Sequence, residues 1–213
     1  MVPILYYANP CGPNVLKAMQ DGLLGFIDTP AQGNERPVGV RWCADNGCFS
    51  DKWDEGKWLR FLTRNVGGVA TCDFATLPDV VGDAAETLKK SSPWIGPVKE
   101  LGYPVAFVAQ DGQESVPVPW GDIDAIFIGG TTEFKLGAYS RDLVAEAKSR
   151  GLWAHMGRVN SRKRFRYASS IGCDSADGTY LTFGPDTNLP KLLSWVLEDR
   201  ESMVMDFGAE VPM

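Results

Sequence analysis

The sequence predicts a compact, somewhat irregular TIM-type (β/α)8 barrel, an α/β fold, that occupies residues 1–213 as a single domain. Three observations support this prediction. The chain has 213 residues, of which 44% are hydrophobic, enough for one globular domain with a substantial core. Eight short apolar runs recur along it, separated by helical or loop segments. Polar residues follow most of these runs, and in a barrel such positions meet at one face.

The expected strands are short apolar runs bounded by turn residues. In chain order they are Ile4–Tyr7, Leu24–Ile27, Val38–Trp42, Val69–Cys72, Val105–Ala109, Ala125–Ile128, Leu152–His155 and Gly172–Ala176. Two connections, 29–39 and 111–124, are too short for a full helix, so we expect an abbreviated barrel.

Apolar residues at helical spacing predict helices between several strands. The ranges are Asn14–Leu24, Asp54–Asn65, Asp83–Leu101 and Thr132–Arg150, and a closing helix follows from Leu189, Leu192, Leu193, Val196 and Leu197. Pro93 and Pro97 interrupt the third helix, and Gly151 ends the fourth. Asn160 and Ser161 are candidate N-caps for a basic segment that follows the seventh strand.

Composition excludes several classes of protein. No apolar run approaches the roughly 20 residues that span a bilayer, so we expect no membrane association. The N-terminus lacks a secretory pattern, and five scattered cysteines argue against a disulfide framework, which favours the cytoplasm. With one histidine and no close cysteine pair, we expect no metal site and no cofactor. Acid–base chemistry would therefore fall to carboxylates.

Polar residues and glycines at the predicted strand ends are the candidate functional residues. They are Asp45, Asp73, Gln110, Gly129, Gly130, His155, Asp174 and Asp177. Each one alone is compatible with an ordinary turn. Six such positions on the same side of successive strands predict a site at the carboxyl-terminal face of the barrel.

The ordered set of motifs resembles the tRNA-guanine transglycosylase family, whose enzymes exchange guanine for a 7-deazaguanine base. The similar segments are D-N-G-C-F-S with Asp45, C-D-F with Asp73, A-Q-D-G with Gln110, I-G-G-T-T-E with Gly129 and Gly130, and G-C-D-S-A-D-G with Asp177. Together they span roughly residues 41 to 180. The family's zinc-binding C-x-C-x2-C…H pattern is absent, and T-Y-L-T stands where the family has L-P-T-R. The chain therefore looks more like the branch that modifies DNA, found in phages and in bacterial DNA-modification islands.

The resemblance implies a role for each matching residue. Asp177 would be the nucleophile that forms a glycosyl–aspartate intermediate, and Asp45 the acid and base at the leaving and entering bases. Asp73 would bind the Watson–Crick edge of the purine. Gln110 and the Gly129–Gly130 backbone would bind O6 and the 7-substituent. The implied partners are guanine-containing DNA and a free 7-deazaguanine base, and the host cytoplasm would be the location for a phage protein. A homodimer or accessory modification proteins stay open.

The basic segment at 158–166 has two interpretations, despite a net charge of −6 for the chain. Its five cations, together with His155, would contact the nucleic-acid backbone, or they would form a solvated helix face. The cations are Arg158, Arg162, Lys163, Arg164 and Arg166. His155 is equally consistent with a satisfied barrel residue, and Asp174 with either orienting the nucleophile or capping a turn.

Three alternatives to the DNA enzyme follow from the same residues. The first is an RNA or tRNA guanine transglycosylase that lacks the zinc subdomain. The second is a non-catalytic barrel that binds a deazapurine, although simple binding needs no carboxylate at C1′. The third is a glycosidase or N-glycosylase that uses water, which leaves the purine-reading residues unexplained. The 7-substituent is not determined, since Lys135 stands where the family has a glutamate.

Overall fold

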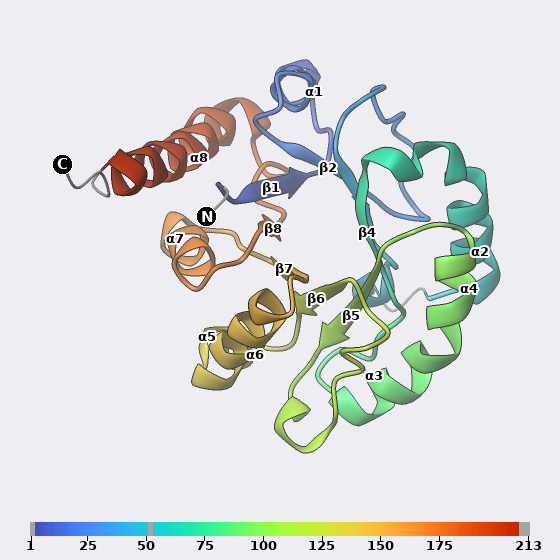
Figure 1. Cartoon of the computed structure of the whole chain (residues 1–213). Helices are drawn as coiled ribbons and strands as arrows, with labels where there is room; N and C mark the ends of the chain where they lie inside the picture. The colour runs from blue at the N-terminus through green and yellow to red at the C-terminus, as the bar shows by residue number, and fades with distance from the viewer. Residues whose placement is uncertain (1–2, 51–52, 209–213) are drawn as a thin grey trace.

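Eight parallel strands form a closed barrel in the computed structural model, which describes residues 3–50 and 53–208. The strands follow one another around the barrel in chain order, and β8 closes it by pairing with β1 (Figure 1). Their bounds are β1 Leu5–Ala8, β2 Gly25–Asp28, β3 Trp42–Ala44, β4 Cys72–Thr76, β5 Val105–Ala109, β6 Ala125–Ile128, β7 Trp153–Met156 and β8 Ser175–Asp177. The predicted TIM-type barrel is confirmed.

Helices surround the barrel as an outer ring (Figure 1). Their bounds are α1 Pro13–Gln20, α2 Glu55–Arg64, α3 Ala84–Ser91, α4 Ile95–Glu100, α5 Thr132–Leu136, α6 Ala138–Ser149, α7 Arg162–Ser170 and α8 Pro185–Gly208. Short 3-10 turns are η1 Cys48–Ser50, η2 Val66–Thr71, η3 Ser92–Trp94 and η4 Gln113–Ser115. The α7 N-cap is Ser161, whose hydroxyl accepts a hydrogen bond from the Arg164 N–H.

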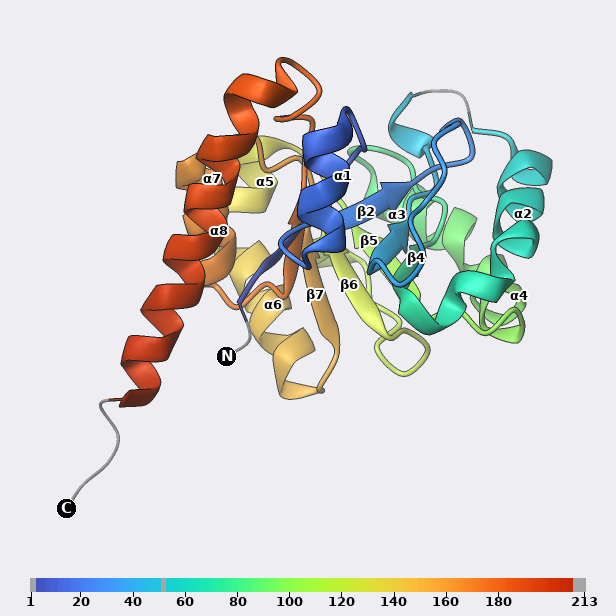
Figure 2. The same ribbon diagram turned by 90° about the horizontal axis from the view of Figure 1, so that it is seen from above.

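The barrel is abbreviated as the sequence predicts. No α-helix covers the connections from β2 to β3 and from β5 to β6 within the described part of the chain. The expected helix at 132–150 is divided into α5 and α6 at Gly137. The expected helix at 83–101 is divided at η3, which contains Pro93, whereas Pro97 lies inside α4 and does not interrupt it. Figure 2 shows that α8 extends along one side and projects beyond the strands. None of the described helices is both long and apolar enough to cross a bilayer.

Alternation along the strands divides the apolar residues between two cores. One core lies between the strands and the helices, and the other fills the inside of the barrel. The inner core contains Leu5, Tyr7, Ile27, Cys43, Phe74, Ala106 and Ala125. Because side chains alternate along a strand, polar residues two positions beyond an inner residue also point toward the barrel axis.

Three strands begin at least three residues later in the sequence than their apolar runs predict. They are β3, β4 and β8, which we expected at 38–42, 69–72 and 172–176. Val38 is exposed in the preceding loop, and the residues before β4 form η2, where the Trp42 indole donates to the Gly68 carbonyl at 2.9 Å. The shift moves Asp73 and Asp174 to the amino-terminal ends of their strands.

Candidate active site

Asp177 is the last residue of β8 and lies at the carboxyl-terminal end of the barrel, as predicted. Its Oδ1 accepts hydrogen bonds from the Arg158 backbone N–H at 3.3 Å and lies 3.0 Å from His155 Nε2. Its Oδ2 has no hydrogen-bond partner among the described residues. The side chain is 16% exposed, so the protein holds one carboxylate oxygen, and the other has no partner among the described residues.

His155 lies inside the barrel beneath Asp177 and is fully buried. Its Nδ1 is 2.8 Å from Ser175 Oγ, and the rings of Tyr7, Phe74 and Phe127 surround it. The prediction that His155 contacts a phosphate is therefore wrong, because an inward-facing position on β7 cannot reach nucleic acid. The other interpretation, a satisfied barrel residue, is correct.

The serine, histidine and aspartate side chains of Ser175, His155 and Asp177 form a hydrogen-bonded row like that of a hydrolytic triad. Here, however, the aspartate lies at the solvent side and the serine at the buried end. Ser175 is completely buried, and its hydroxyl also accepts a hydrogen bond from Trp153 Nε1 at 2.8 Å. A nucleophilic serine has to reach its substrate, whereas here the carboxylate is the exposed member. Asp177 is therefore the reactive candidate, and the serine lies at the buried end of the chain.

Asp45 follows β3 and lies two residues beyond the inward-facing Cys43. Its backbone N–H donates to the Asp28 carbonyl at 2.8 Å, which continues the strand pairing, and its Oδ1 accepts from the Gly47 N–H at 2.6 Å. Burial, together with the nearby charges of Asp177 and Asp79, raises the pKa of Asp45 to about 7. A carboxyl group with this pKa can both donate and accept a proton near neutral pH.

Asp79 is a site residue that the sequence analysis missed. It follows β4 and is 8% exposed. Its Oδ1 accepts from Asn46 Nδ2 at 2.8 Å and its Oδ2 from Gln110 Nε2 at 2.6 Å. Burial raises the pKa of Asp79, against the lowering effect of these donors. The signal was present, because the apolar run continues past Asp73 to Leu77 and Asp79 is the first acidic residue after it.

Asp73 occupies the opposite end of the barrel, so its predicted place at the carboxyl-terminal face is wrong. It is the second residue of β4, beside the register shift between β3 and β4. Its carboxylate accepts from the Tyr7 hydroxyl and forms an ion pair with Arg41 at 2.5 Å. It therefore lies at the amino-terminal end of the barrel, away from Asp177.

Asp174 also has a structural role, which settles the two alternatives in the sequence analysis against orienting the nucleophile. It precedes β8, and its carboxylate binds Lys148 Nζ at 2.6 Å and the Ala154 N–H at 2.8 Å. These contacts join β7, β8 and α6 at the amino-terminal end of the strands, away from Asp177.

Gln110 and the two glycines lie at the carboxyl-terminal face as predicted. The Gln110 amide is buried, and its Oε1 accepts from the Gly82 N–H at 2.9 Å while its nitrogen binds Asp79. A Cβ on Gly129 would come within 2.8 Å of Val108, and one on Gly130 within 2.6 Å of an Asp111 oxygen. The glycines thus allow β6 to end close against the loop that follows β5.

Arg158 contacts Asp177 through its backbone N–H and directs its guanidinium elsewhere. Its φ of 58° lies in the left-handed region, its guanidinium donates to the Gly130 carbonyl, and it stacks 4.6 Å from the centroid of the Phe49 ring. Phe49 is 63% exposed, so the pair with Arg158 leaves much of this aromatic side chain open to solvent. Sequence analysis passed over Phe49, although it follows Asp45 by only four residues.

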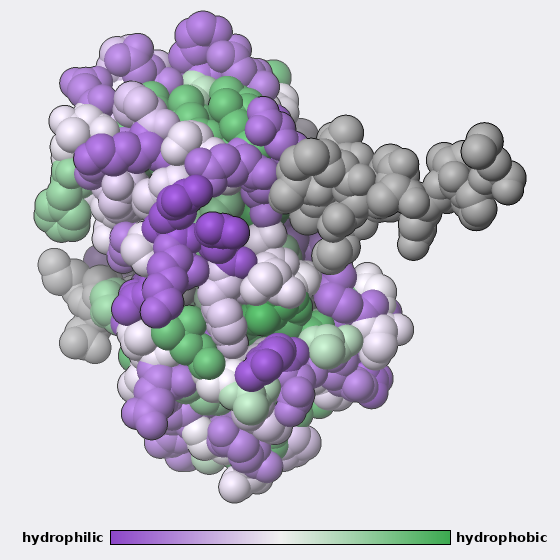
Figure 3. Space-filling view, turned by 90° about the vertical axis from the view of Figure 1, so that its left-hand side faces the viewer, coloured by the Kyte–Doolittle hydropathy of each residue, from purple (hydrophilic) through white to green (hydrophobic). Residues whose placement is uncertain are grey.

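The other cations of the basic segment differ in their partners and in their exposure. Arg162 forms an exposed ion pair with Glu198 of α8 at 2.6 Å. Arg164 donates to the Thr132 hydroxyl at 3.3 Å. Lys163 and Arg166 are exposed on α7. The surface formed by this side of the molecule is largely hydrophilic, with separate small apolar areas (Figure 3).

Lys135 of α5 is a buried cation beside the site. Its ammonium donates to the Gly157 carbonyl at 2.9 Å, and the side chain is 3% exposed. Burial and the positive charge of Arg158 lower the pKa of Lys135 to about 8.

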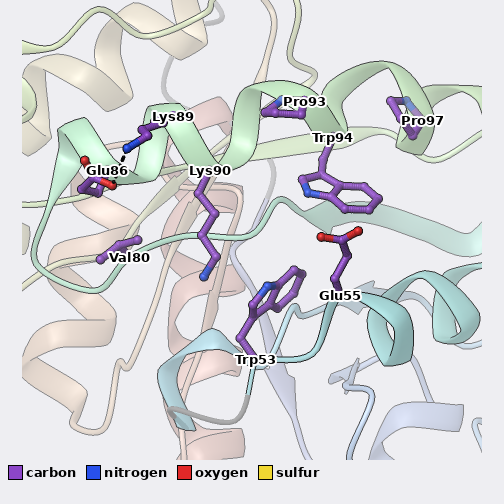
Figure 4. A pocket seen from close by; sticks show the side chains of 9 residues that line it. All are labelled: Trp53, Glu55, Val80, Glu86, Lys89, Lys90, Pro93, Trp94 and Pro97. Atoms are coloured by element: carbon purple, nitrogen blue, oxygen red, sulfur yellow. Dashed lines mark hydrogen bonds and ion pairs between the residues drawn. The ribbon is translucent and has the colours of Figure 1, made fainter.

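A surface cleft of about 580 Å3 lies outside the barrel, against α3 and α4. Trp53, Glu55 and Trp94 line it, and Lys90 points across it toward Trp53 (Figure 4). The Lys90 ammonium also donates to the Asp79 carbonyl at 2.8 Å. The cleft therefore lies behind the loop that carries Asp79.

In the described ranges, no three acidic, cysteine or histidine side chains are grouped to hold a metal ion.

Comparison with known proteins supports the fold. No family model and no curated protein matches the chain. An aldolase, QR15, is 11% identical with a TM-score of 0.57 and covers 95% of this chain and 96% of its own. A 3-hexulose-6-phosphate synthase from Salmonella typhimurium is 14% identical with a TM-score of 0.47, covering 93% of this chain and all (100%) of its own. The HpcH/HpaI aldolase from Desulfitobacterium hafniense is 11% identical with a TM-score of 0.49, covering 99% and 94%. The similarity to QR15, at 11% identity, shows a shared fold and does not bear on the reaction.

Proposed function

We propose that the chain is a base-exchange transglycosylase that replaces guanine in DNA with a 7-deazaguanine derivative through a covalent glycosyl–aspartate intermediate. The observation that carries this proposal is the contrast between two carboxyl groups at one end of the barrel. Asp177 accepts donors on one oxygen and presents the other, whereas burial raises the pKa of Asp45 to about 7. Two carboxyl groups with different environments suit a nucleophile and an acid–base partner.

The reaction consists of two displacements at C1′. Asp177 Oδ2 attacks C1′, the bond from C1′ to guanine N9 breaks, and its electron pair stays on N9. The protonated Asp45 gives its proton to the departing base. The resulting carboxylate then removes the proton from the incoming base, whose nitrogen attacks C1′ and releases Asp177. Two inversions retain the configuration of the sugar.

Asp79 replaces Asp73 as the proposed residue for the Watson–Crick edge of the purine. Its oxygens accept hydrogen bonds from Asn46, Gln110 and the Cys48 side chain, and a carboxylate has about four acceptor sites, so part of its acceptor capacity stays open. A guanine-like base offers N1–H and an exocyclic amine on one edge, which matches a carboxylate. Phe49 offers its exposed ring for stacking on the same base.

DNA is the proposed substrate because cations lie beside the carboxylates although the chain as a whole is acidic. Arg158 binds over the end of β6, and Arg164 reaches Thr132 at the start of α5. The target nucleotide has to leave its stack to bring C1′ to Asp177. We assign the phosphate contacts to these two arginines ahead of Arg162, whose charge is paired with Glu198.

The test incubates the purified protein with guanine-containing DNA and a panel of 7-deazaguanine bases, followed by mass spectrometry of the nucleosides. We expect incorporation by the native protein and by Asp122→Asn, a control at an exposed aspartate. We expect none by Asp177→Asn. Incorporation that persists in Asp177→Asn would refute the assignment of the nucleophile.

Parallel arms separate the alternatives. Incorporation into tRNA alone would contradict the DNA assignment and favour the RNA enzyme. Release of guanine without a base acceptor would indicate hydrolysis. A sample quenched in acid before the acceptor is added should contain protein that carries the DNA on Asp177, located by peptide mass spectrometry. Tight binding of a free base without exchange would favour the non-catalytic barrel.

A further inference from the structure

A chain of buried polar groups runs inside the barrel toward Asp177, and the proposed reaction does not use it. Trp153 Nε1 donates to Ser175 Oγ at 2.8 Å, Ser175 Oγ is 2.8 Å from His155 Nδ1, and His155 Nε2 is 3.0 Å from Asp177 Oδ1. Ser175 and His155 have no exposed surface. A polar chain in such an apolar place is costly unless every donor finds an acceptor.

The donors and acceptors of this chain can be assigned from its ends. The Trp153 indole can only donate, so Ser175 Oγ accepts from it. The Ser175 hydroxyl proton then needs an acceptor, and His155 Nδ1 is its remaining partner among the described residues. A neutral imidazole that accepts at Nδ1 carries its proton on Nε2, where it donates to the Asp177 carboxylate.

We propose that His155 is a positioning residue, held as the neutral Nε2–H tautomer by Trp153 and Ser175, which fixes the Asp177 carboxylate through Oδ1. Two of the three groups come from β7 and one from β8, so strand pairing at His155 and Ser175 sets the geometry. The Arg158 N–H approaches the same oxygen. Both contacts therefore leave Oδ2 directed to the substrate. The kinetic consequence rests on the proposed function, but the hydrogen-bond assignment does not.

The first experiment is nitrogen-15 NMR of the untagged protein, in which His155 is the only histidine. The expected result at neutral pH is one set of ring signals with a pyrrole-type Nε2 and a pyridine-type Nδ1. The Asp177→Asn variant should change the Nε2 signal. An imidazolium or an Nδ1–H tautomer in the native protein would overturn the proposal, whether or not the protein has any activity.

The second experiment uses two substitutions of the same residue. The nitrogen of a glutamine in His155→Gln can occupy the place of Nε2 and donate to Asp177, whereas His155→Asn reaches only the place of Nδ1. We expect His155→Asn to lower kcat about 10- to 100-fold, the effect of losing a hydrogen bond to a charged group. KM should change less than about threefold, since the base contacts remain. His155→Gln should retain kcat within about fivefold of the native value.

The outcomes distinguish failure of the inference from failure of the proposed function. Equal kcat values for the two variants, or a native kcat in His155→Asn, would refute the positioning role. No base exchange by the native protein on any substrate would contradict the proposed function alone, because the NMR experiment decides the tautomer without turnover. Thermal unfolding shows whether each variant is folded, and if His155→Asn is not, the NMR result decides.

Discussion

The raised pKa of Asp45 makes a prediction about stability that does not depend on the reaction. A carboxyl group whose pKa is higher in the folded state binds its proton more tightly there, so folding is favoured at low pH. Stability is lost as the pH rises from the unfolded pKa of 3.8 through the folded pKa of about 7. Asp45→Asn removes this titration and should therefore stabilise the protein at alkaline pH.

The magnitude follows from the shift itself. A change from 3.8 to about 7 corresponds to about 4 kcal/mol of unfolding free energy at pH 8, taking about 1.4 kcal/mol per unit. Of this loss in unfolding free energy, about 1.6 kcal/mol has already occurred in the native protein at pH 5. The stability of Asp45→Asn relative to the native protein should thus rise by up to about 2.5 kcal/mol between pH 5 and pH 8.

Urea unfolding at the two pH values measures this difference, because other titrating groups cancel between variant and native protein. Asp111→Asn is a control of opposite sign. Hydrogen bonds from the Thr131 N–H and hydroxyl lower the pKa of Asp111 below 3.8, so its stabilising effect is constant between pH 5 and pH 8 and is lost only on acidification through the folded pKa. Asp111→Asn should therefore show no change in relative stability between the two pH values, and a change of opposite sign only in more acidic solution. If Asp45→Asn gained no stability relative to the native protein between pH 5 and pH 8, the buried-acid assignment would be refuted.

Three further predictions concern the site. Gly130→Ala should lower the free energy of unfolding by about 2–3 kcal/mol, because φ is +70° and the new Cβ would lie 2.6 Å from an Asp111 carboxylate oxygen. Gly112→Ala, with a φ of +85° and no atom within 4 Å of the new Cβ, is the control and should lower it by only about 1 kcal/mol. Urea unfolding measures both. Asp79→Asn replaces one acceptor oxygen with an NH2 group that faces a donor, and should raise the KM for the free base about 10- to 100-fold in steady-state kinetics. An unchanged KM would exclude Asp79 from base binding. In fluorescence titration, Arg158→Ala should weaken DNA binding about tenfold and reduce the slope of log affinity against log salt concentration by about one. Arg162→Ala should change the DNA affinity less than about twofold.

The barrel was predictable because its signals are local. Apolar runs of four or five residues, prolines at 93 and 97 and the short links at 29–39 and 111–124 are all visible in the sequence. The structure confirms eight strands and the two abbreviated connections. Each of these features depends on neighbouring residues and requires no knowledge of strand pairing.

The errors lie at strand bounds, where pairing outweighs the local pattern. The residues 69–71 have an apolar β-type composition, yet they form the end of η2, and β4 runs from Cys72 to Thr76. β4 begins three residues and ends four residues later than predicted, which moves Asp73 from the carboxyl to the amino end of the barrel and places Asp79 at the site instead. Sequence similarity of short motifs cannot detect such a shift.

The sequence by itself determined the fold class, the number of strands, and the placing of Asp45, Gln110 and Asp177 after β-type runs, because alternation and turn chemistry are encoded locally. Tertiary structure decided which end of the barrel each polar residue occupies and which polar side chains are hydrogen-bonded to one another. His155 illustrates the difference: the sequence left a phosphate contact and a buried barrel position equally open, and only the pairing of β7 with β8 placed it between Ser175 and Asp177. The physical reason is that register and burial are properties of pairs of strands, and no single segment contains them.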